Sequence, residues 1–199
     1  MEIIREFALT FVPLFVAMDP VGNLPIFLAL TQGIEPKHRR HVVHLATLTA
    51  LGVGLGFVAI GQAIFLLLGI NVADFLMAGG IIMLILATRY LLTGKVVETE
   101  ESSASETVGV VPLGTPLVVG PAVLASLLSL TGQYRISIVL ASFVLNLAIQ
   151  WVFFRQADRI IEFLGRSGAN AISKIAMLLL AAIAVKMIRE GVLTIVLTK

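Results

Sequence analysis

The sequence predicts an all-α integral membrane protein, and three observations lead to that prediction. First, 58% of the 199 residues are hydrophobic and 13% are charged, with a mean hydropathy of +1.03. A soluble domain of this size could not bury that much apolar surface. Second, the apolar residues form long runs that few charges interrupt. Third, a proline motif interrupts the first of these runs and another interrupts the fourth.

Six runs are long enough to cross roughly 30 Å of hydrocarbon at about 1.5 Å per helical residue. We therefore expect six transmembrane helices, near residues 7–32, 42–68, 73–93, 108–131, 136–155 and 172–195. An acidic, serine-rich segment separates the third run from the fourth and is predicted to be a cytoplasmic linker. The expected organisation is one transmembrane domain made of a three-helix unit (1–94), the linker (95–107) and a second three-helix unit (108–199).

The distribution of basic residues predicts the topology. Nine of the 14 Lys and Arg residues lie on the side of the odd-numbered connections, and five lie on the other side. The connection 32–41 alone contains three of them, whereas the connection 69–74 contains none. By the positive-inside rule, both termini should be outside. The first run is predicted to be a retained helix, because it contains a carboxylate and no cleavage pattern follows it.

The two proline motifs predict an internal repeat. They are Asp19-Pro20-x4-Pro25 and Thr115-Pro116-x4-Pro121, and their offset is constant at 96, because 115 − 19, 116 − 20 and 121 − 25 are equal. Each half of the chain contains three runs, an odd number, so the second half should enter the membrane upside down. We therefore expect two inverted three-helix repeats, with helices 1 and 4 broken at the proline motifs and facing each other.

Both breaks are predicted to lie near the middle of the membrane, about 20 Å and 14 Å beyond the nearest preceding charge. Asp and Thr are good N-cap residues and proline is favoured at the first helical position, so Asp19-Pro20 and Thr115-Pro116 should each begin a half-helix. The second prolines should leave residues 21–24 and 117–120 partly unwound. Backbone groups freed at this depth need partners, so the breaks should line an enclosed cavity.

These breaks give the candidate substrate-binding residues, which are Asp19, Pro20, Gly22, Asn23, Pro25, Thr115, Pro116, Gly120 and Pro121. Half-helix N-termini attract an anion, whereas free carbonyls and a carboxylate attract a cation. A small zwitterion such as an amino acid matches both.

Three of these residues have a second interpretation. Asp19 either binds the substrate ammonium or a coupling cation, a proton included, or is only an N-cap. Asn23 either contacts the substrate or caps a half-helix that begins at Leu24. The hydroxyl of Thr115 has the same two alternatives, the substrate or the backbone.

Three strings carry a family resemblance: DPVGNLPIF (19–27), AGGIIMLILA (78–87) and VPLGTPLVVGPA (111–122). They resemble the MarC family of bacterial inner-membrane proteins, of the UPF0056 type, which includes the SnatA neutral amino acid transporters. The resemblance implies six membrane spans, an inner-membrane location and, through the SnatA branch, transport of small neutral amino acids such as glycine and alanine. Gly114 stands where an alanine is usual in the family.

The expected function is therefore a secondary transporter. It could import or export its substrate, and it could be coupled to H⁺, to Na⁺ or to no ion. The alternatives are a channel or regulatory protein with the same fold, and a membrane-embedded enzyme. An enzyme would need a nucleophile with a base, a carboxylate pair or a metal cluster, and the runs contain one central carboxylate and no HExxH motif. We expect no enzymatic activity, no cofactor and no metal site.

The expected partners are the lipid bilayer, a small neutral amino acid and the coupling ion. The basic residues are spread between the runs, so no nucleic-acid partner is expected. The absence of cysteine excludes disulfides and thiolate metal sites. Glycines at 52, 54, 56 and 61 give the second helix a small-residue face that could support either intramolecular packing or a homo-oligomer.

Overall fold

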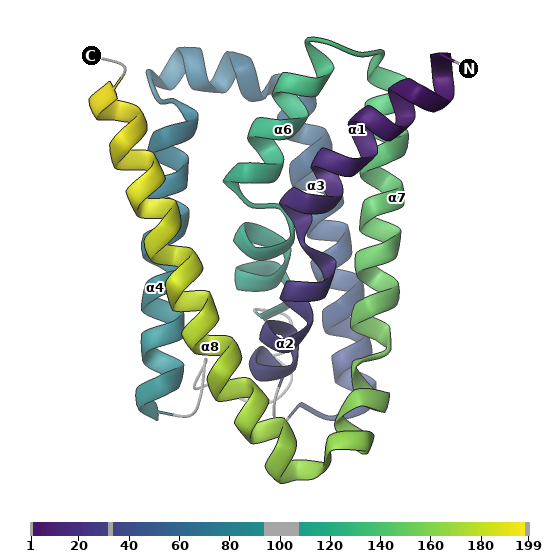
Figure 1. Ribbon diagram of the computed structural model, residues 1–199, viewed down its shortest axis with the longest axis vertical. Helices are drawn as coiled ribbons and strands as arrows, with labels where there is room; N and C mark the ends of the chain where they lie inside the picture. Colours follow the sequence, from purple (N-terminus) through teal and green to yellow (C-terminus); the bar gives the residue numbers. More distant parts are fainter. Residues whose placement is uncertain (1, 32–33, 94–107, 198–199) are drawn as a thin grey trace.

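The computed structural model describes residues 2–31, 34–93 and 108–197, and these residues form helices joined by short connections (Figure 1). The elements are α1 (Glu2–Met18), α2 (Pro20–Leu30), α3 (Pro36–Leu68), α4 (Val72–Thr93), the π-helix η1 (Gly109–Val118), α6 (Pro121–Thr131), α7 (Ile136–Arg155) and α8 (Ala157–Leu197). The predicted linker 95–107 lies outside the described residues.

Several described segments are long and apolar enough to cross a membrane. Four do so by themselves, namely Glu2–Leu30, Pro36–Gly61, Val72–Thr93 and Ile136–Arg155. The pair η1 and α6, bent by 53°, makes a fifth if it is taken as one span. The prediction of an all-α integral membrane protein is thus confirmed, with four to five candidate spans among the described residues.

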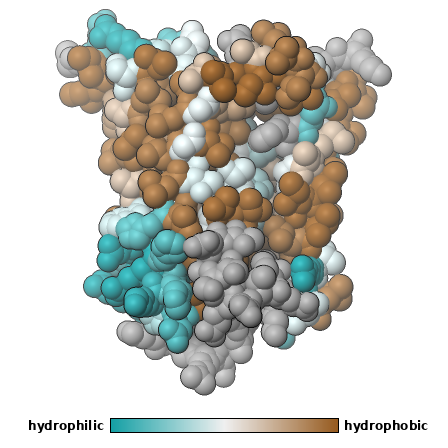
Figure 2. All heavy atoms as spheres, turned by 180° about the vertical axis from the view of Figure 1, so that it is seen from behind, coloured by the Kyte–Doolittle hydropathy of each residue, from teal (hydrophilic) through white to brown (hydrophobic). Residues whose placement is uncertain are grey.

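The outer surface has the composition of a membrane protein. Val16, Leu67, Ile85 and Leu178 are each more than half exposed, and many other large apolar side chains also face outward. Figure 2 shows such side chains over much of one face, with a large group of hydrophilic side chains at the lower left and a smaller one at the upper left. A surface this apolar is unfavourable in water and suits a hydrocarbon environment.

Helices α4 and α8 lie side by side over much of their length. A Cβ added at Gly80 would lie 2.8 Å from the Ala184 carbonyl oxygen, and one at Gly191 would lie 2.7 Å from the Ala73 carbonyl oxygen. Glycine at both positions therefore lets the two backbones approach closely, as small residues do in membrane helix pairs.

The helix contacts match in pairs when the two halves of the chain are exchanged. Helix α3 packs against η1 as α7 packs against α1, and α2 contacts α8 as α6 contacts α4. The contacts α3–α7 and α4–α8 join helices that occupy the same place in each half. Both ends of the chain lie at the same end of the molecule (Figure 1).

Hydrogen bonds attach the middle of α1, which precedes Asp19, to α7. The hydroxyls of Thr10 and Ser142 are 2.7 Å apart, and Asn146 Nδ2 donates to the Phe11 carbonyl at 3.2 Å. Because these groups are buried, the bonds satisfy polar atoms that would otherwise be costly in the membrane. They fix α1, the helix that precedes the first break, against α7.

The far end of α2 is also held. Arg39, which is buried, donates from Nη2 to the carbonyl of Thr31 at 3.2 Å and to that of Ile34 at 3.0 Å. A guanidinium is well placed there, because the C-terminus of a helix has free carbonyls and a partial negative charge.

Candidate functional site

Asp19 forms the first break, a single residue between α1 and α2. Its backbone is left-handed, with φ 43° and ψ 65°, and its Oδ1 accepts a hydrogen bond from the Gly22 amide at 3.0 Å. The N-cap predicted from Asp-Pro is thus confirmed. Asp19 is the one non-glycine residue with positive φ in the described part of the chain. Aspartate accepts this conformation more readily than most residues, because its short side chain bonds locally.

The residues after Asp19 shape its surroundings. A Cβ at Gly22 would lie 2.1 Å from Asp19 Oδ2, so glycine leaves the space that the carboxylate fills. Asn23 Nδ2 donates to the Met18 carbonyl at 2.6 Å. Asn23 therefore satisfies the end of α1, and its interpretation as the cap of a half-helix beginning at Leu24 is wrong.

Helix α2 is continuous from its first residue, which corrects a prediction. Residues 21–24 are helical rather than unwound, and Pro25 lies inside the helix. The backbone N–H of Asn23 donates to the Asp19 carbonyl at 3.0 Å, so helical hydrogen bonding begins before Pro25. Pro25 lacks a backbone N–H, but the loss of this one donor does not unwind the turn before it.

The second break lies later in its motif than predicted. Thr115 is extended, with φ −142° and ψ 131°, inside the kinked η1, and its Oγ1 has no hydrogen-bond partner. The half-helix begins instead at Pro121, after Val119 and Gly120. The prediction that Thr115 is an N-cap is therefore wrong. A residue before proline is pushed toward extended backbone, and β-branched threonine cannot easily take the left-handed conformation of Asp19.

Gly120 is needed for this second break. Its backbone is extended, and an added Cβ would lie 2.3 Å from the Pro116 carbonyl oxygen. Helix α6 starts here without a side-chain cap, because glycine has none to offer. The first half-helix is thus capped by its own carboxylate, and the second is not.

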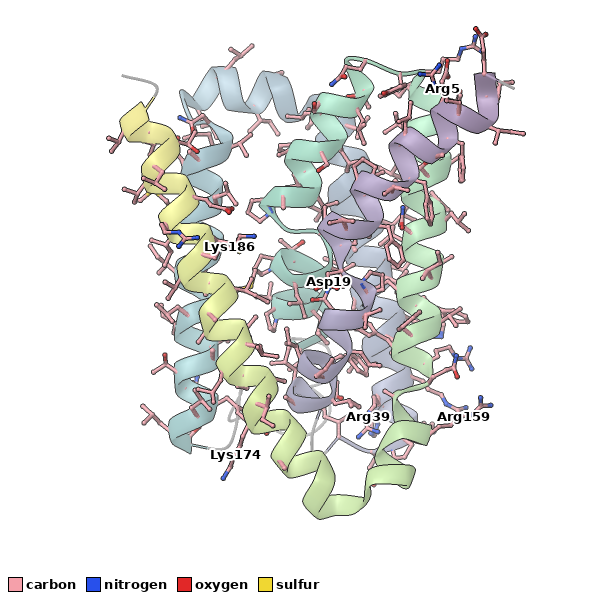
Figure 3. The ribbon with its side chains drawn as sticks, viewed as in Figure 1. Arg5, Asp19, Arg39, Arg159, Lys174 and Lys186 are labelled. Atoms are coloured by element: carbon pink, nitrogen blue, oxygen red, sulfur yellow. The ribbon has the colours of Figure 1, made fainter. Side chains whose placement is uncertain are left out.

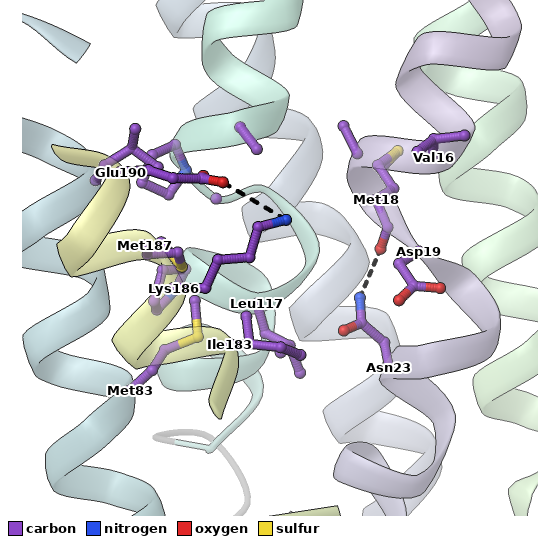
Figure 4. A pocket seen from close by; sticks show the side chains of 16 residues that line it. Val16, Met18, Asp19, Asn23, Met83, Leu117, Ile183, Lys186, Met187 and Glu190 are labelled. Carbon is purple, nitrogen blue, oxygen red and sulfur yellow. Dashed lines mark hydrogen bonds and ion pairs between the residues drawn. The ribbon is translucent and has the colours of Figure 1, made fainter. Parts of the chain in front are cut away.

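Both breaks open on one cavity of about 350 Å³, seen from close by in Figure 4. Its lining comes from the two breaks and from α4 and α8, and consists of Val16, Ala17, Met18, Asp19, Asn23, Leu76, Met83, Pro116, Leu117, Gly120, Pro121, Ala122, Ile183, Lys186, Met187 and Glu190.

Five of the nine predicted site residues line this cavity, namely Asp19, Asn23, Pro116, Gly120 and Pro121. The other four, Pro20, Gly22, Pro25 and Thr115, are not part of its lining. Pro20 and Gly22 instead belong to the first turn of α2, where they start the helix and accommodate the cap. The structure thus brings residues of both proline motifs to one cavity.

Helix α8 supplies a wall of the cavity that the sequence did not predict. Lys186 Nζ lies 3.7 Å from Glu190 Oε1, and both residues line the cavity. Figures 3 and 4 show Lys186 reaching into the cavity from α8 while Asp19 lies across from it at the first break. The available signal was a Lys and a Glu four residues apart within the sixth apolar run.

The rest of this wall is apolar. Leu76 and Met83 from α4 and Ile183 and Met187 from α8 also line the cavity. Within the described residues, no group of three or more His, Cys, Asp or Glu side chains could hold a metal ion. The described cavity thus combines one carboxylate at a helix break, one Lys–Glu pair and an apolar surface.

Comparisons with known proteins find relatives among membrane proteins. A family model described as "MarC family integral membrane protein" matches residues 4–196. The UPF0056 inner membrane protein YhgN of Escherichia coli is 33% identical over 183 residues, covering 90% of this chain and 92% of its own. The UPF0056 membrane protein YvbG of Bacillus subtilis is 31% identical over 193 residues, with 91% of each chain covered. A UPF0056 membrane protein of Pyrococcus abyssi is 30% identical over 195 residues, with 96% of each covered. No solved structure matches the chain.

Proposed function

The chain belongs to the MarC family of integral membrane proteins, and from that premise we propose that it is a secondary transporter for small neutral amino acids. One observation supports this most strongly. Two proline-broken segments, one from each half of the chain, open on a single cavity that contains a carboxylate. Discontinuous helices that meet at the interface of two repeats are the usual binding site of such transporters.

We propose six spans in two inverted repeats, with residues 172–195 of α8 as the sixth span. The exchange pattern of the helix contacts supports this, since each half places its broken helix against the second helix of the other half. The proposed setting is the inner membrane, with both termini outside. Arg39, Arg159 and Lys174 lie toward the end of the molecule away from the two chain ends (Figure 3), as the positive-inside rule would place them.

The cavity favours a zwitterion with an uncharged side chain. Asp19 offers a negative charge to an ammonium group, and Lys186 offers a positive one to a carboxylate. The remaining wall is largely aliphatic, so a charged substrate side chain would lose its hydration without gaining a partner there. Asp19 is also the group to which a coupling H⁺ or Na⁺ would bind. The roles proposed for Asp19 and Lys186 are to bind the substrate and not to react with it. We therefore propose a carrier rather than an enzyme.

Counterflow of labelled alanine into proteoliposomes tests the proposal. Vesicles loaded with unlabelled alanine or glycine should accumulate the label transiently, because a carrier exchanges one substrate molecule for another. Accumulation that depends on a pH or Na⁺ gradient would identify the coupling ion. A leak that is linear in concentration and shows no counterflow would instead indicate a channel. Absence of any flux across a panel of neutral amino acids would overturn the transporter assignment.

A further inference from the structure

Lys186 and Glu190 form a charged pair that the proline motifs do not account for. They lie one turn apart on α8, and both line the cavity. Within a membrane span, ionisable residues are costly and usually mark a site that handles charge. The question is therefore what the pair does when a ligand enters.

The pair is loosely held. Its 3.7 Å separation is longer than an N–H···O hydrogen bond, and the two side chains are 62% and 46% exposed. Ion pairs this open are weak, so another anion can compete for the ammonium group at little cost. No other carboxylate among the described residues pairs with Lys186.

The alternative anchor for an anion on the first broken helix is already occupied. The Gly22 amide at the start of α2 donates to Asp19 Oδ1, so this amide is already bonded to the cap of its own helix. Asp19 adds a negative charge on the same side of the cavity, which disfavours an anion there. Of the described lining residues, Lys186 is the one cation.

We propose that Lys186 binds the carboxylate of the substrate and that Glu190 holds Lys186 when the cavity is empty. This inference rests on the proposed function and adds its specificity-determining residue. Substrate binding exchanges the Lys186–Glu190 contact for a contact between Lys186 and the carboxylate, while Asp19 faces the ammonium group. The pair therefore selects α-amino acids over amines that lack a carboxylate.

The test compares alanine with alaninamide, which keeps the ammonium group and the methyl group but has no carboxylate. Each competes with labelled alanine in counterflow at about pH 6.5, where both amines are mostly protonated. In the native protein, alanine should compete about 10- to 100-fold better, the worth of a charge-assisted hydrogen bond. In Lys186→Gln, the affinity for alanine should fall by that factor, the affinity for alaninamide should not change, and the preference should disappear.

Two further variants control this test. Glu190→Gln frees Lys186, so alanine should compete several-fold better while alaninamide is unchanged. Lys174→Gln, an exposed residue of α8 that lies 12 positions before Lys186 and outside the cavity lining, should leave the preference as in the native protein. A preference that survives in Lys186→Gln would overturn the inference. If that variant does not reconstitute, an unchanged preference in Glu190→Gln would overturn it.

A binding measurement separates this inference from the proposed transport. Alanine should raise the melting temperature of the detergent-purified protein more than alaninamide does, and Lys186→Gln should abolish the difference. Transport without this dependence would reject the role of Lys186 alone. A Lys186-dependent shift without counterflow would reject transport and keep the carboxylate site. Neither shift nor counterflow would reject both.

Discussion

The two breaks share a proline spacing but differ in backbone and in charge. The first is one left-handed residue, Asp19, whose carboxylate caps the helix that follows. The second is the non-helical pair Val119 and Gly120, and the helix after it has no side-chain cap. The residue at the start of each motif explains the difference, because aspartate can take the left-handed conformation and threonine cannot easily do so. A repeat motif thus predicts where a helix breaks only to within a few residues.

The packing of the two half-helices differs as well. Helix α2 contacts α8 more extensively than α6 contacts α4, although exchange of the two halves relates these contacts. The two halves of the chain therefore make corresponding helix contacts, but to different extents. Under the proposed function, alternating access would convert one arrangement into the other around the same cavity.

Gly120→Ala should have the largest effect of the substitutions that compare the breaks. The new Cβ would lie 2.3 Å from the Pro116 carbonyl oxygen, a backbone atom that cannot move alone. We expect a loss of about 1–3 kcal/mol of stability, as for overpacking, and strongly reduced exchange. Thermal unfolding in detergent and counterflow would measure both. The matched control is Gly52→Ala, whose added Cβ would meet nothing within 4 Å, and an unchanged melting temperature in Gly120→Ala would show that the second break is not constrained.

Gly22→Ala should affect function more than stability. Its Cβ would meet the end of the Asp19 side chain at 2.1 Å, so the carboxylate can rotate away and give up its cap. The lost cap costs about 1 kcal/mol, and alanine in a helix regains a similar amount. The melting temperature should therefore stay near the native value while exchange falls. A native exchange rate in this variant would show that the position of the carboxylate is unimportant.

Thr115→Val should have the smallest effect. The hydroxyl has no hydrogen-bond partner, and the residue is not part of the cavity lining. Replacing the hydroxyl with a methyl group should change the free energy of unfolding by less than about 0.5 kcal/mol and should leave counterflow unchanged. A marked loss of exchange without unfolding would restore Thr115 as a substrate contact.

Much of the fold could be predicted from the sequence because apolar runs and prolines act locally. The runs predicted the helices to within a few residues, apart from the earlier start of α8, and Asp19-Pro20 predicted the first break. The second break was misplaced because the motif was aligned by its prolines, whereas the conformations of Thr115 and Gly120 decided it.

The wall formed by α4 and α8 could not be predicted in the same way. Whether Lys186 faces lipid, a neighbouring helix or a cavity depends on how α8 is rotated against α4. That rotation follows from close contacts at Gly80 and Gly191, which are distant in sequence from both breaks. A charge inside an apolar run indicated a functional site, but it did not identify the cavity that the charge lines.

Counterflow by Asp19→Asn tests whether the carboxylate at the first break takes part in transport. Asparagine is as good an N-cap as aspartate and also accepts the left-handed conformation, so the first break should keep its geometry while its charge is removed. A melting temperature near that of the native protein would verify the fold. If Asp19 binds the substrate ammonium or a coupling cation, exchange should fall by about 10-fold or more. Exchange within about twofold of the native rate would show that Asp19 is only a cap.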